Sequence, residues 1–316
     1  SDPAIMLYLK STLLALGAAF GLTVAQQSTN QAITLQTHSL YPPYIDDDLQ
    51  NRWFDFGGDA VINTNKHVRL TSNRPSQVGY LWSRLPLTAA NFEIELEYNV
   101  DGPSGHLFGD GFALWLSKQR MSIGPVFGSV NNFDGLGIFF DTYDNERSHK
   151  HSFPYVQAML GDGYKYYDND KDGSSTELAG CEADFRGKTV VTKARLTFYK
   201  DNYLRLELQH EKEDEWTECF KVPNVKLPDQ VYLGFTAHTG EISDNHDIIA
   251  VTTKTLIPVP IEKQKPIPQT GKKTKSSSGG GGVLWFLFKM VAAGGIVGGM
   301  FVAYRMYEKS GNMKRF

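Results

Sequence analysis

Segments in which apolar and polar residues alternate at every second position constrain the fold of this chain more than any other feature. Residues 92–98 place three glutamates between apolar residues, and residues 194–198 and 204–208 repeat the alternation on either side of a polar turn at 200–202. Successive side chains of a β-strand point to opposite faces of a sheet. This period therefore predicts half-buried strands, the last two paired as a hairpin.

Three further segments, 112–116, 137–140 and 232–236, are apolar almost throughout, as expected for strands that are covered on both faces. Turn sequences occur at Asp101-Gly-Pro, Asn131-Asn-Phe-Asp-Gly and Asp162-Gly. Hydrophobic residues make up 41% of the chain, which is enough for a packed core. The sequence therefore predicts an all-β fold, a two-sheet β-sandwich over residues 35–256.

The beginning of the chain has the three parts of a secretory signal peptide. Lys10 precedes an apolar run at 13–24, and the small residues Thr23 and Ala25 precede the polar Gln26. We therefore expect a signal peptide at 6–25 that is cleaved after Ala25, which places the mature chain in the secretory lumen. Residues 1–5 precede the expected initiator methionine and are left out of the fold prediction.

A second apolar run, residues 283–304, is about as long as the ~20 residues that cross a bilayer. Basic residues follow it in the tail at 305–316, which predicts a single transmembrane helix with its C-terminus in the cytosol. Residues 257–282, rich in proline, lysine, glycine and serine, form the expected stalk between body and membrane. The prediction is a type I membrane protein, anchored in the lipid bilayer by its C-terminal helix.

The expected compartment determines whether the two cysteines, Cys181 and Cys219, are oxidised or reduced. In an oxidising lumen we expect them to form a disulfide, with two buried free thiols as the alternative. The formal net charge is −3, and the dense lysine cluster lies in the expected stalk. Because no broad basic surface is available to neutralise phosphates, we expect no nucleic-acid partner.

Acidic and amide residues cluster beside four of the expected strands, at 109–111, 141–145, 167–173 and 240–245. Between Asp141 and Asn145, two side-chain oxygens and the carbonyl of Tyr143 lie within reach of one hard cation. An aspartate from another loop would add to the roughly six to eight oxygens that calcium prefers, so these clusters predict a calcium site. Residues 168–173 also match the first half of an EF-hand loop, but its twelfth position is Ala179 rather than glutamate and its neighbours are strand-like.

Several short motifs occur in the order found in one known family. They are Gly109-Asp-Gly-Phe-Ala-Leu-Trp115, Gly124-Pro-Val-Phe-Gly128, Gly135-Leu-Gly-Ile-Phe-Phe-Asp-Thr-Tyr143, Phe153-Pro-Tyr155, Lys171-Asp-Gly173, Thr176-Glu-Leu-Ala-Gly-Cys181 and Ser243-Asp-Asn-His-Asp247. Over nearly its whole length the chain resembles the L-type (leguminous-type) lectins of the early secretory pathway, most closely their vesicular integral membrane mannose-lectin branch.

This resemblance implies a concanavalin-like jelly roll that binds Ca²⁺ and high-mannose N-glycans. It also implies a protein without enzymatic activity, a cargo receptor or quality-control lectin for glycoproteins in the membranes of the ER, the ER–Golgi intermediate compartment or the Golgi. The terminal Lys314-Arg-Phe316 resembles the export signals of the family, so vesicle-coat components are expected partners of the tail.

By position, the resemblance assigns calcium ligation to Asp141, Tyr143 (through its carbonyl), Asn145 and Asp172. It assigns carbohydrate binding to Ser76, Asp110, Asn145, Asn169, Asp172, Gly240, Glu241 and Ile242. Calcium would organise the loops, while fixed carboxylates and amides would hydrogen-bond vicinal hydroxyls whose geometry distinguishes mannose from glucose. The family has histidine at the position of Asn169, and because asparagine does not titrate near neutrality we expect no pH switch there.

Two other functions stay open. A lectin-fold scaffold that has lost sugar binding is suggested by Asn169 and by Glu241, since the family has Gly-Asp-Leu where this chain has Gly-Glu-Ile. A glycoside hydrolase is the other alternative, because Glu93, Glu95 and Glu97 project from one strand face and glycosidases use paired carboxylates. Alternation with apolar residues explains these three glutamates without catalysis.

Overall fold

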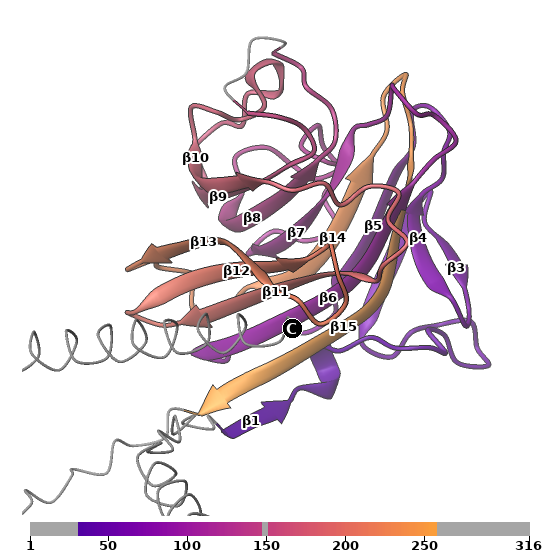
Figure 1. Ribbon diagram of the computed structural model, residues 1–316. Coiled ribbons are helices and arrows are strands. Elements are labelled where there is room, and N and C mark those ends of the chain that lie inside the picture. Colours follow the sequence, from indigo (N-terminus) through magenta and orange to yellow (C-terminus); the bar gives the residue numbers. More distant parts are fainter. Residues whose placement is uncertain (1–30, 147–150, 258–316) are drawn as a thin grey trace, which may run out of the picture. The chain divides into compact units, whose positions relative to one another are not determined.

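The structure, a computed structural model, describes residues 31–146 and 151–257. The chain divides into two compact units, 1–260 and 261–316, and all of the described residues lie in the first. They form fifteen strands and two short 3-10 helices, and the strands make two antiparallel sheets packed face to face (Figure 1). The predicted β-sandwich is confirmed.

The first sheet, sheet A, has eight strands in the order β13-β12-β11-β6-β15-β4-β3, with β1 paired to β15 beside this path. Their bounds are β1 (Gln31–Thr34), β3 (Val61–Asn63), β4 (His67–Thr71), β6 (Asn91–Asp101), β11 (Thr192–Tyr199), β12 (Tyr203–Gln209), β13 (Thr217–Pro223) and β15 (Asn245–Ile257).

The second sheet, sheet B, has seven strands in the order β10-β9-β8-β7-β14-β5-β2. Their bounds are β2 (Phe54–Gly58), β5 (Val78–Ser83), β7 (Gly111–Ser117), β8 (Asp134–Asp141), β9 (Tyr155–Asp162), β10 (Glu177–Glu182) and β14 (Tyr232–His238). The two helices are η1 (Gln36–His38) and η2 (Asn169–Lys171).

The strand β6 shows how sequence alternation becomes sandwich packing. Along it every second side chain is buried in the core between the sheets, and the side chains between them are half-buried on the other face of sheet A. The strands β11 and β12 form the predicted hairpin, with Tyr199 paired to Tyr203 beside the turn. Removal of the alternate apolar side chains from water holds sheet A against sheet B.

The central strands of sheet B, β7, β8 and β14, are buried on both faces, as their continuously apolar segments predicted. All seven residues of β7 are buried, and its side chains alternate between the inter-sheet core and a second apolar cluster on the opposite face. Loops at 118–133 and 163–171 cover that face. From these loops the rings of Phe127 and Tyr167 pack on Phe139 of β8, with ring centroids 5.1 and 4.9 Å apart.

Cys181 of β10 and Cys219 of β13 form a disulfide, with their Cα atoms 5.3 Å apart. The strand β10 lies at the edge of sheet B and β13 at the edge of sheet A. The disulfide therefore links the two sheets along one side of the sandwich.

At both ends the folded body extends beyond the predicted range of 35–256. The strand β1 pairs with the end of β15, with Gln31 opposite Ile257. Its side chains from Ala32 to Thr34 are exposed, so it has no alternating pattern and only backbone pairing reveals it.

The predicted signal peptide (6–25), transmembrane helix (283–304) and tail lie outside the described residues, as does the stalk after Ile257. Within the described part of the chain, no helix has the length and apolar character needed to cross a bilayer.

Candidate functional site

A cavity of about 250 Å³ opens at one end of sheet B. Strand β7 begins directly after Asp110, β8 ends at Asp141 and β14 ends at His238. Antiparallel pairing places Gly111 opposite both Asp141 and His238, so residues far apart in sequence share this edge. The cavity is lined by Asp110, Pro125, Phe127, Asp141, Asn145, Tyr167, Asn169 and His238.

Asp141 is the buried acid of the cavity, with 2% of its surface exposed. Its carboxylate accepts a hydrogen bond from the backbone N–H of Tyr143 at 2.9 Å. Burial raises the pKa of Asp141 well above its usual range, an effect that the Tyr143 N–H opposes. The nearby carboxylates of Asp172, Asp110 and Asp144 raise this pKa further. Several acids therefore meet at this end of the sheet, which favours a cation among them.

A hydrogen-bond network centred on Asn145 holds Asp172 beside the cavity. The Asp172 carboxylate accepts hydrogen bonds from the Asn145 backbone N–H at 3.1 Å and from its side-chain Nδ2 at 2.6 Å. The backbone N–H of Glu146 adds a third at 3.2 Å. The Asp172 carbonyl accepts a further bond from the buried Gln157 amide at 2.6 Å. These bonds tie together the two loops that carry the predicted calcium ligands.

The backbone conformation at Asp172 and Gly173 sets the position of this carboxylate. Asp172 ends η2 in the left-handed region with φ 46°, and Gly173 follows with φ 66°. A Cβ on Gly173 would overlap the ring of Tyr167, so both conformation and space require glycine there. This turn, rather than an EF-hand with flanking helices, explains the acidic run at 168–173.

Asp110 forms the opposite rim of the cavity. His238 Nδ1 lies 3.3 Å from Asp110 Oδ2, and both side chains are about one-third exposed. Gly240 approaches the same carboxylate so closely that a Cβ there would lie 3.3 Å from Asp110 Oδ1. The Gly240 carbonyl accepts a hydrogen bond from the backbone N–H of Ser76 at 2.9 Å. Ser76 and Gly240 therefore support this rim through their backbones.

The structure brings most of the predicted site residues to one place. Four line the cavity, namely Asp110, Asp141, Asn145 and Asn169. Four more support its walls through the contacts given above, namely Ser76, Tyr143, Asp172 and Gly240. Glu241 and Ile242 follow Gly240 in the chain but do not line the cavity.

Sequence reasoning missed four lining residues, namely Pro125, Phe127, Tyr167 and His238. Phe127 and Tyr167 are aromatic residues, a type that commonly fills a core, and both do pack in the outer apolar cluster. His238 did offer a signal, because it is a titratable residue at the end of an apolar strand, two residues before Gly240.

The donor chemistry of the site fits a hard cation such as Ca²⁺. It offers the buried carboxylates of Asp141 and Asp172, backbone carbonyls and the amide of Asn145, whose Nδ2 bonds to Asp172 and leaves Oδ1 as an oxygen donor. In residues 31–146 and 151–257, no three His, Cys, Asp or Glu side chains are gathered closely enough to hold a metal by themselves. Amide and carbonyl oxygens would therefore complete the coordination shell.

The three glutamates of β6 lie on the outer face of sheet A, away from the cavity. Glu93, Glu95 and Glu97 each have a cationic partner, respectively Lys254 at 3.2 Å, Arg195 at 3.0 Å and Lys193 at 3.7 Å. Their neighbours Phe92, Ile94 and Leu96 are buried in the core. Ion pairing across the strands accounts for these carboxylates as part of a solvated sheet face.

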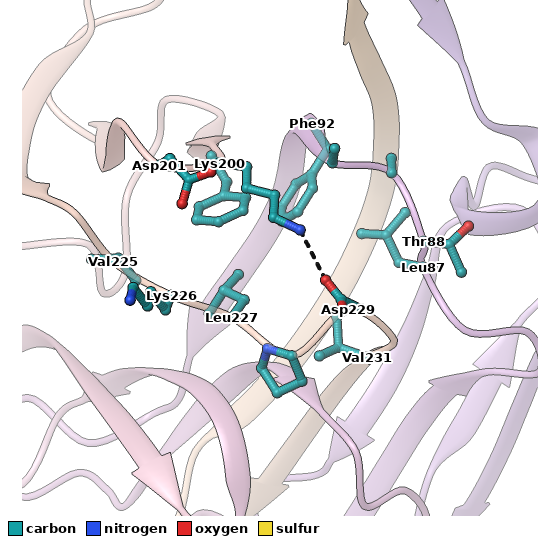
Figure 2. Close-up of a pocket in the computed structure, with 14 residues that line it drawn as sticks. Leu87, Thr88, Phe92, Lys200, Asp201, Val225, Lys226, Leu227, Asp229 and Val231 are labelled. Carbon is teal, nitrogen blue, oxygen red and sulfur yellow. Dashed lines mark hydrogen bonds and ion pairs between the residues drawn. The ribbon is translucent and has the colours of Figure 1, made fainter.

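A second cavity, of about 340 Å³, lies next to the beginning of β14, at the end of that strand opposite to His238. Figure 2 shows Lys200 reaching toward Asp229 across it, and their ion pair measures 2.9 Å. The side chains around it are largely apolar, among them Leu87, Phe92 and Val231. None of the predicted site residues lines this cavity, so the candidate site is the first one.

Comparison with known proteins gives a consistent result. Residues 31–263 match the Legume-like lectin family. An L-type lectin-like domain-containing protein of Schizosaccharomyces pombe is 36% identical over 236 residues, which cover 74% of this chain and 75% of that protein. The vesicular integral-membrane protein VIP36 of Homo sapiens is 40% identical over 217 residues, which cover 68% of this chain and 60% of the length of VIP36.

Solved structures agree with these relatives. The exoplasmic/lumenal domain of VIP36 in its Ca²⁺/Man-bound form has a TM-score of 0.68 and 38% identity, covering 71% of this chain and 92% of that domain. The carbohydrate recognition domain of Emp47p, at 21% identity and a TM-score of 0.59, shares the fold. The sandwich, the motifs and these matches together show that this chain belongs to the legume-like lectin family.

Proposed function

We propose that this protein is a calcium-dependent lectin that binds high-mannose N-glycans and carries glycoproteins between the ER and the Golgi. The supporting observation is the shared cavity of Asp110, Asp141, Asn145 and Asn169 beside the buried Asp172. Carboxylates accept and amides both donate and accept hydrogen bonds, which suits the vicinal hydroxyls of a hexose. The similar VIP36 domain has Ca²⁺-bound and Ca²⁺/Man3GlcNAc-bound forms.

In this proposal calcium is held by Asp141, Asp172, Asn145 and the carbonyl of Tyr143. The cation would offset the mutual repulsion of the carboxylates and would fix the two loops that Asn145 already links. The sugar would then contact Asp110, Asn145, Asn169 and Asp172, with Ser76 and the backbone at 240–242 closing the rim.

The transport role rests on the two ends of the chain as well as on the site. The signal peptide at 6–25 and the membrane span at 283–304 would hold the sandwich in the lumen on the stalk at 257–282. The tail at 305–316 would face coat components in the cytosol. VIP36 is by name a vesicular integral-membrane protein, which supports the same arrangement here.

Glycan-array binding by the full chain in detergent, with calcium and again with a chelator, tests the proposal. We expect high-mannose glycans to bind only with calcium. Asp172→Asn is expected to abolish binding, because it removes a charge that both the cation and Asn145 use. Asp170→Asn is the matched control, since Asp170 is an exposed carboxylate of η2, two residues before Asp172, and does not line the cavity.

Calcium should also stabilise the folded protein. At a calcium concentration roughly 100-fold above Kd, the free energy of unfolding is expected to rise by about 2.7 kcal/mol in the unaltered protein and not in Asp172→Asn.

In the glycan-array experiment, glycan binding that survives the chelator would contradict the role of calcium. Absence of binding in both conditions would favour the scaffold alternative, and release of reducing sugar from a mannan would favour a hydrolase.

A further inference from the structure

The loop that leads from β9 to η2 exposes two tyrosines. Tyr164 is 89% exposed and Tyr166 is 59% exposed, and Tyr164 is the most exposed large hydrophobic residue in the described part of the chain. Burying a large apolar side chain is favourable by roughly 1.5–3 kcal/mol. Two exposed rings on one short loop form a local apolar surface that is available to a ligand.

Hydrogen bonds fix the backbone from which these rings project. The Asp162 carboxylate accepts the N–H of Tyr164 at 2.9 Å, and the Asn132 amide donates to the Tyr164 carbonyl at 2.7 Å. Asn131 closes the other end of the loop through two bonds with the backbone of Tyr167, at 2.9 and 2.8 Å. The backbone that carries the exposed tyrosines is thus held by hydrogen bonds, so binding of a ligand would not have to order the loop at 163–167.

The same loop continues directly into the carbohydrate cavity. Tyr167 turns inward and lines the cavity, and Asn169 follows in its wall. A chain spans at most about 3.6 Å per residue, so the Cα of Tyr166 lies within about 11 Å of that of Asn169, and the Cα of Tyr164 within about 18 Å. These bounds are short enough for an oligosaccharide that begins against Asn169 and runs along this loop to contact Tyr166 and then Tyr164.

We propose that Tyr164 and Tyr166 extend the carbohydrate site by stacking on hexoses of the glycan that lie outside the cavity. This inference rests on the proposed function and adds two residues that contact the glycan outside the cavity. One face of a pyranose ring carries mainly C–H groups and packs on an aromatic face, while the tyrosine hydroxyl stays in water. Tyrosine has only two side-chain torsions to immobilise, so little entropy is lost on contact.

Calorimetric titration of the full chain in detergent with calcium, using methyl α-mannoside and a free high-mannose oligosaccharide, tests this inference. Tyr166→Ala is expected to lower the affinity for the oligosaccharide about 3- to 10-fold, the size of one aromatic contact, and to leave the affinity for methyl α-mannoside unchanged. Tyr166→Phe should keep the affinity because it keeps the ring. Tyr41→Ala, at an exposed tyrosine on the strand-edge loop before β2, is the matched control.

The possible results separate this inference from the proposed function. If Tyr164→Ala/Tyr166→Ala binds the oligosaccharide as tightly as the unaltered protein, the inference is overturned and the lectin function stands. An equal loss for both sugars also overturns it, since the cavity itself would be altered. If the unaltered protein binds neither sugar, the proposed function fails and this inference fails with it.

Discussion

Arg186 and Asp244 form an ion pair that supports the loop leading to Asp110. Asp244 is fully buried, and the guanidinium Nε and Nη2 of Arg186 lie 2.6 and 2.8 Å from its two oxygens. The same guanidinium donates to the Ser104 carbonyl at 2.9 Å. Burial raises the pKa of the Asp244 carboxyl, and the Arg186 charge opposes that rise. The position of the loop at 102–110 therefore depends on the ion pair between Arg186 and the buried Asp244.

Arg186→Met is expected to lower the free energy of unfolding by about 3–5 kcal/mol, because it leaves a buried carboxylate unpaired. Urea denaturation measures this change. The double variant Arg186→Met/Asp244→Leu should recover much of the loss, since no uncompensated charge remains. Lys188→Met, which breaks the more exposed pair with Asp184, is the control and should cost no more than about 1 kcal/mol. Equal effects of the two single variants would contradict the prediction.

At the scale of elements, the two sheets meet through their core and through one covalent link between their edges. The disulfide joins β10 to β13 across a sequence separation of 38 residues. Edge strands have a hydrogen-bonded neighbour on one side only. The disulfide therefore protects the edge where sheet A and sheet B would otherwise open.

Replacement of both cysteines by serine is expected to reduce the free energy of unfolding by about 2–4 kcal/mol, because the unfolded chain regains the freedom of the closed loop. Urea denaturation of oxidised and variant protein measures this. Calcium-dependent glycan binding should persist below the new transition, since none of the cavity residues lies on β10 or β13. A loss of binding in protein that remains folded would show that the edge also positions the site.

At the scale of the whole molecule, buried histidines couple folding to pH. His38, His210 and His246 are buried, and burial lowers the pKa of each, that of His246 to about 3. In the unfolded chain these groups titrate near their ordinary pKa of about 6.5. For His246, between about pH 3 and pH 6.5, the unfolded state binds a proton that the folded state does not. The stability that comes from burying the three neutral histidines is therefore present above about pH 6.5 and is lost as pH falls.

We expect the free energy of unfolding to fall below about pH 6.5, with His246 contributing up to about 1.4 kcal/mol per pH unit. His246→Asn should reduce that slope while keeping a side chain that can hydrogen-bond to the Thr71 hydroxyl, which lies 2.7 Å from His246 Nδ1. Urea denaturation from pH 7.5 to 5, with a chelator to remove calcium linkage, measures the slopes. His106→Asn, a substitution at an exposed histidine, is the control. If the free energy of unfolding of His246→Asn changes with pH as steeply as that of the unaltered protein, His246 is not responsible for the pH dependence.

Patterns of apolar and polar residues along single segments of the sequence predicted several elements of this fold. The alternation of β6, the hairpin of β11 and β12 and the fully apolar β7 follow from the period of their side chains, because each strand buries one face or both. β1 was not predicted, because a short exposed strand is stabilised by backbone pairing with β15 alone. In the candidate site, Asp141 and Asn145 form a local motif, whereas only packing shows that Tyr167 belongs to the outer apolar cluster and also lines the cavity.

The sequence by itself determined the β-sandwich class, six of the fifteen strands in the described residues and the lectin family, because side-chain periodicity, turn residues and ordered motifs are local properties of a chain. Only the tertiary structure decided that Asp110, Asp141 and His238 meet at one edge, since this depends on the register of β7 with β8 and β14. It also decided that Tyr167 faces inward while Tyr164 and Tyr166 stay exposed. Contacts between distant segments depend on pairing and packing, which no local pattern specifies.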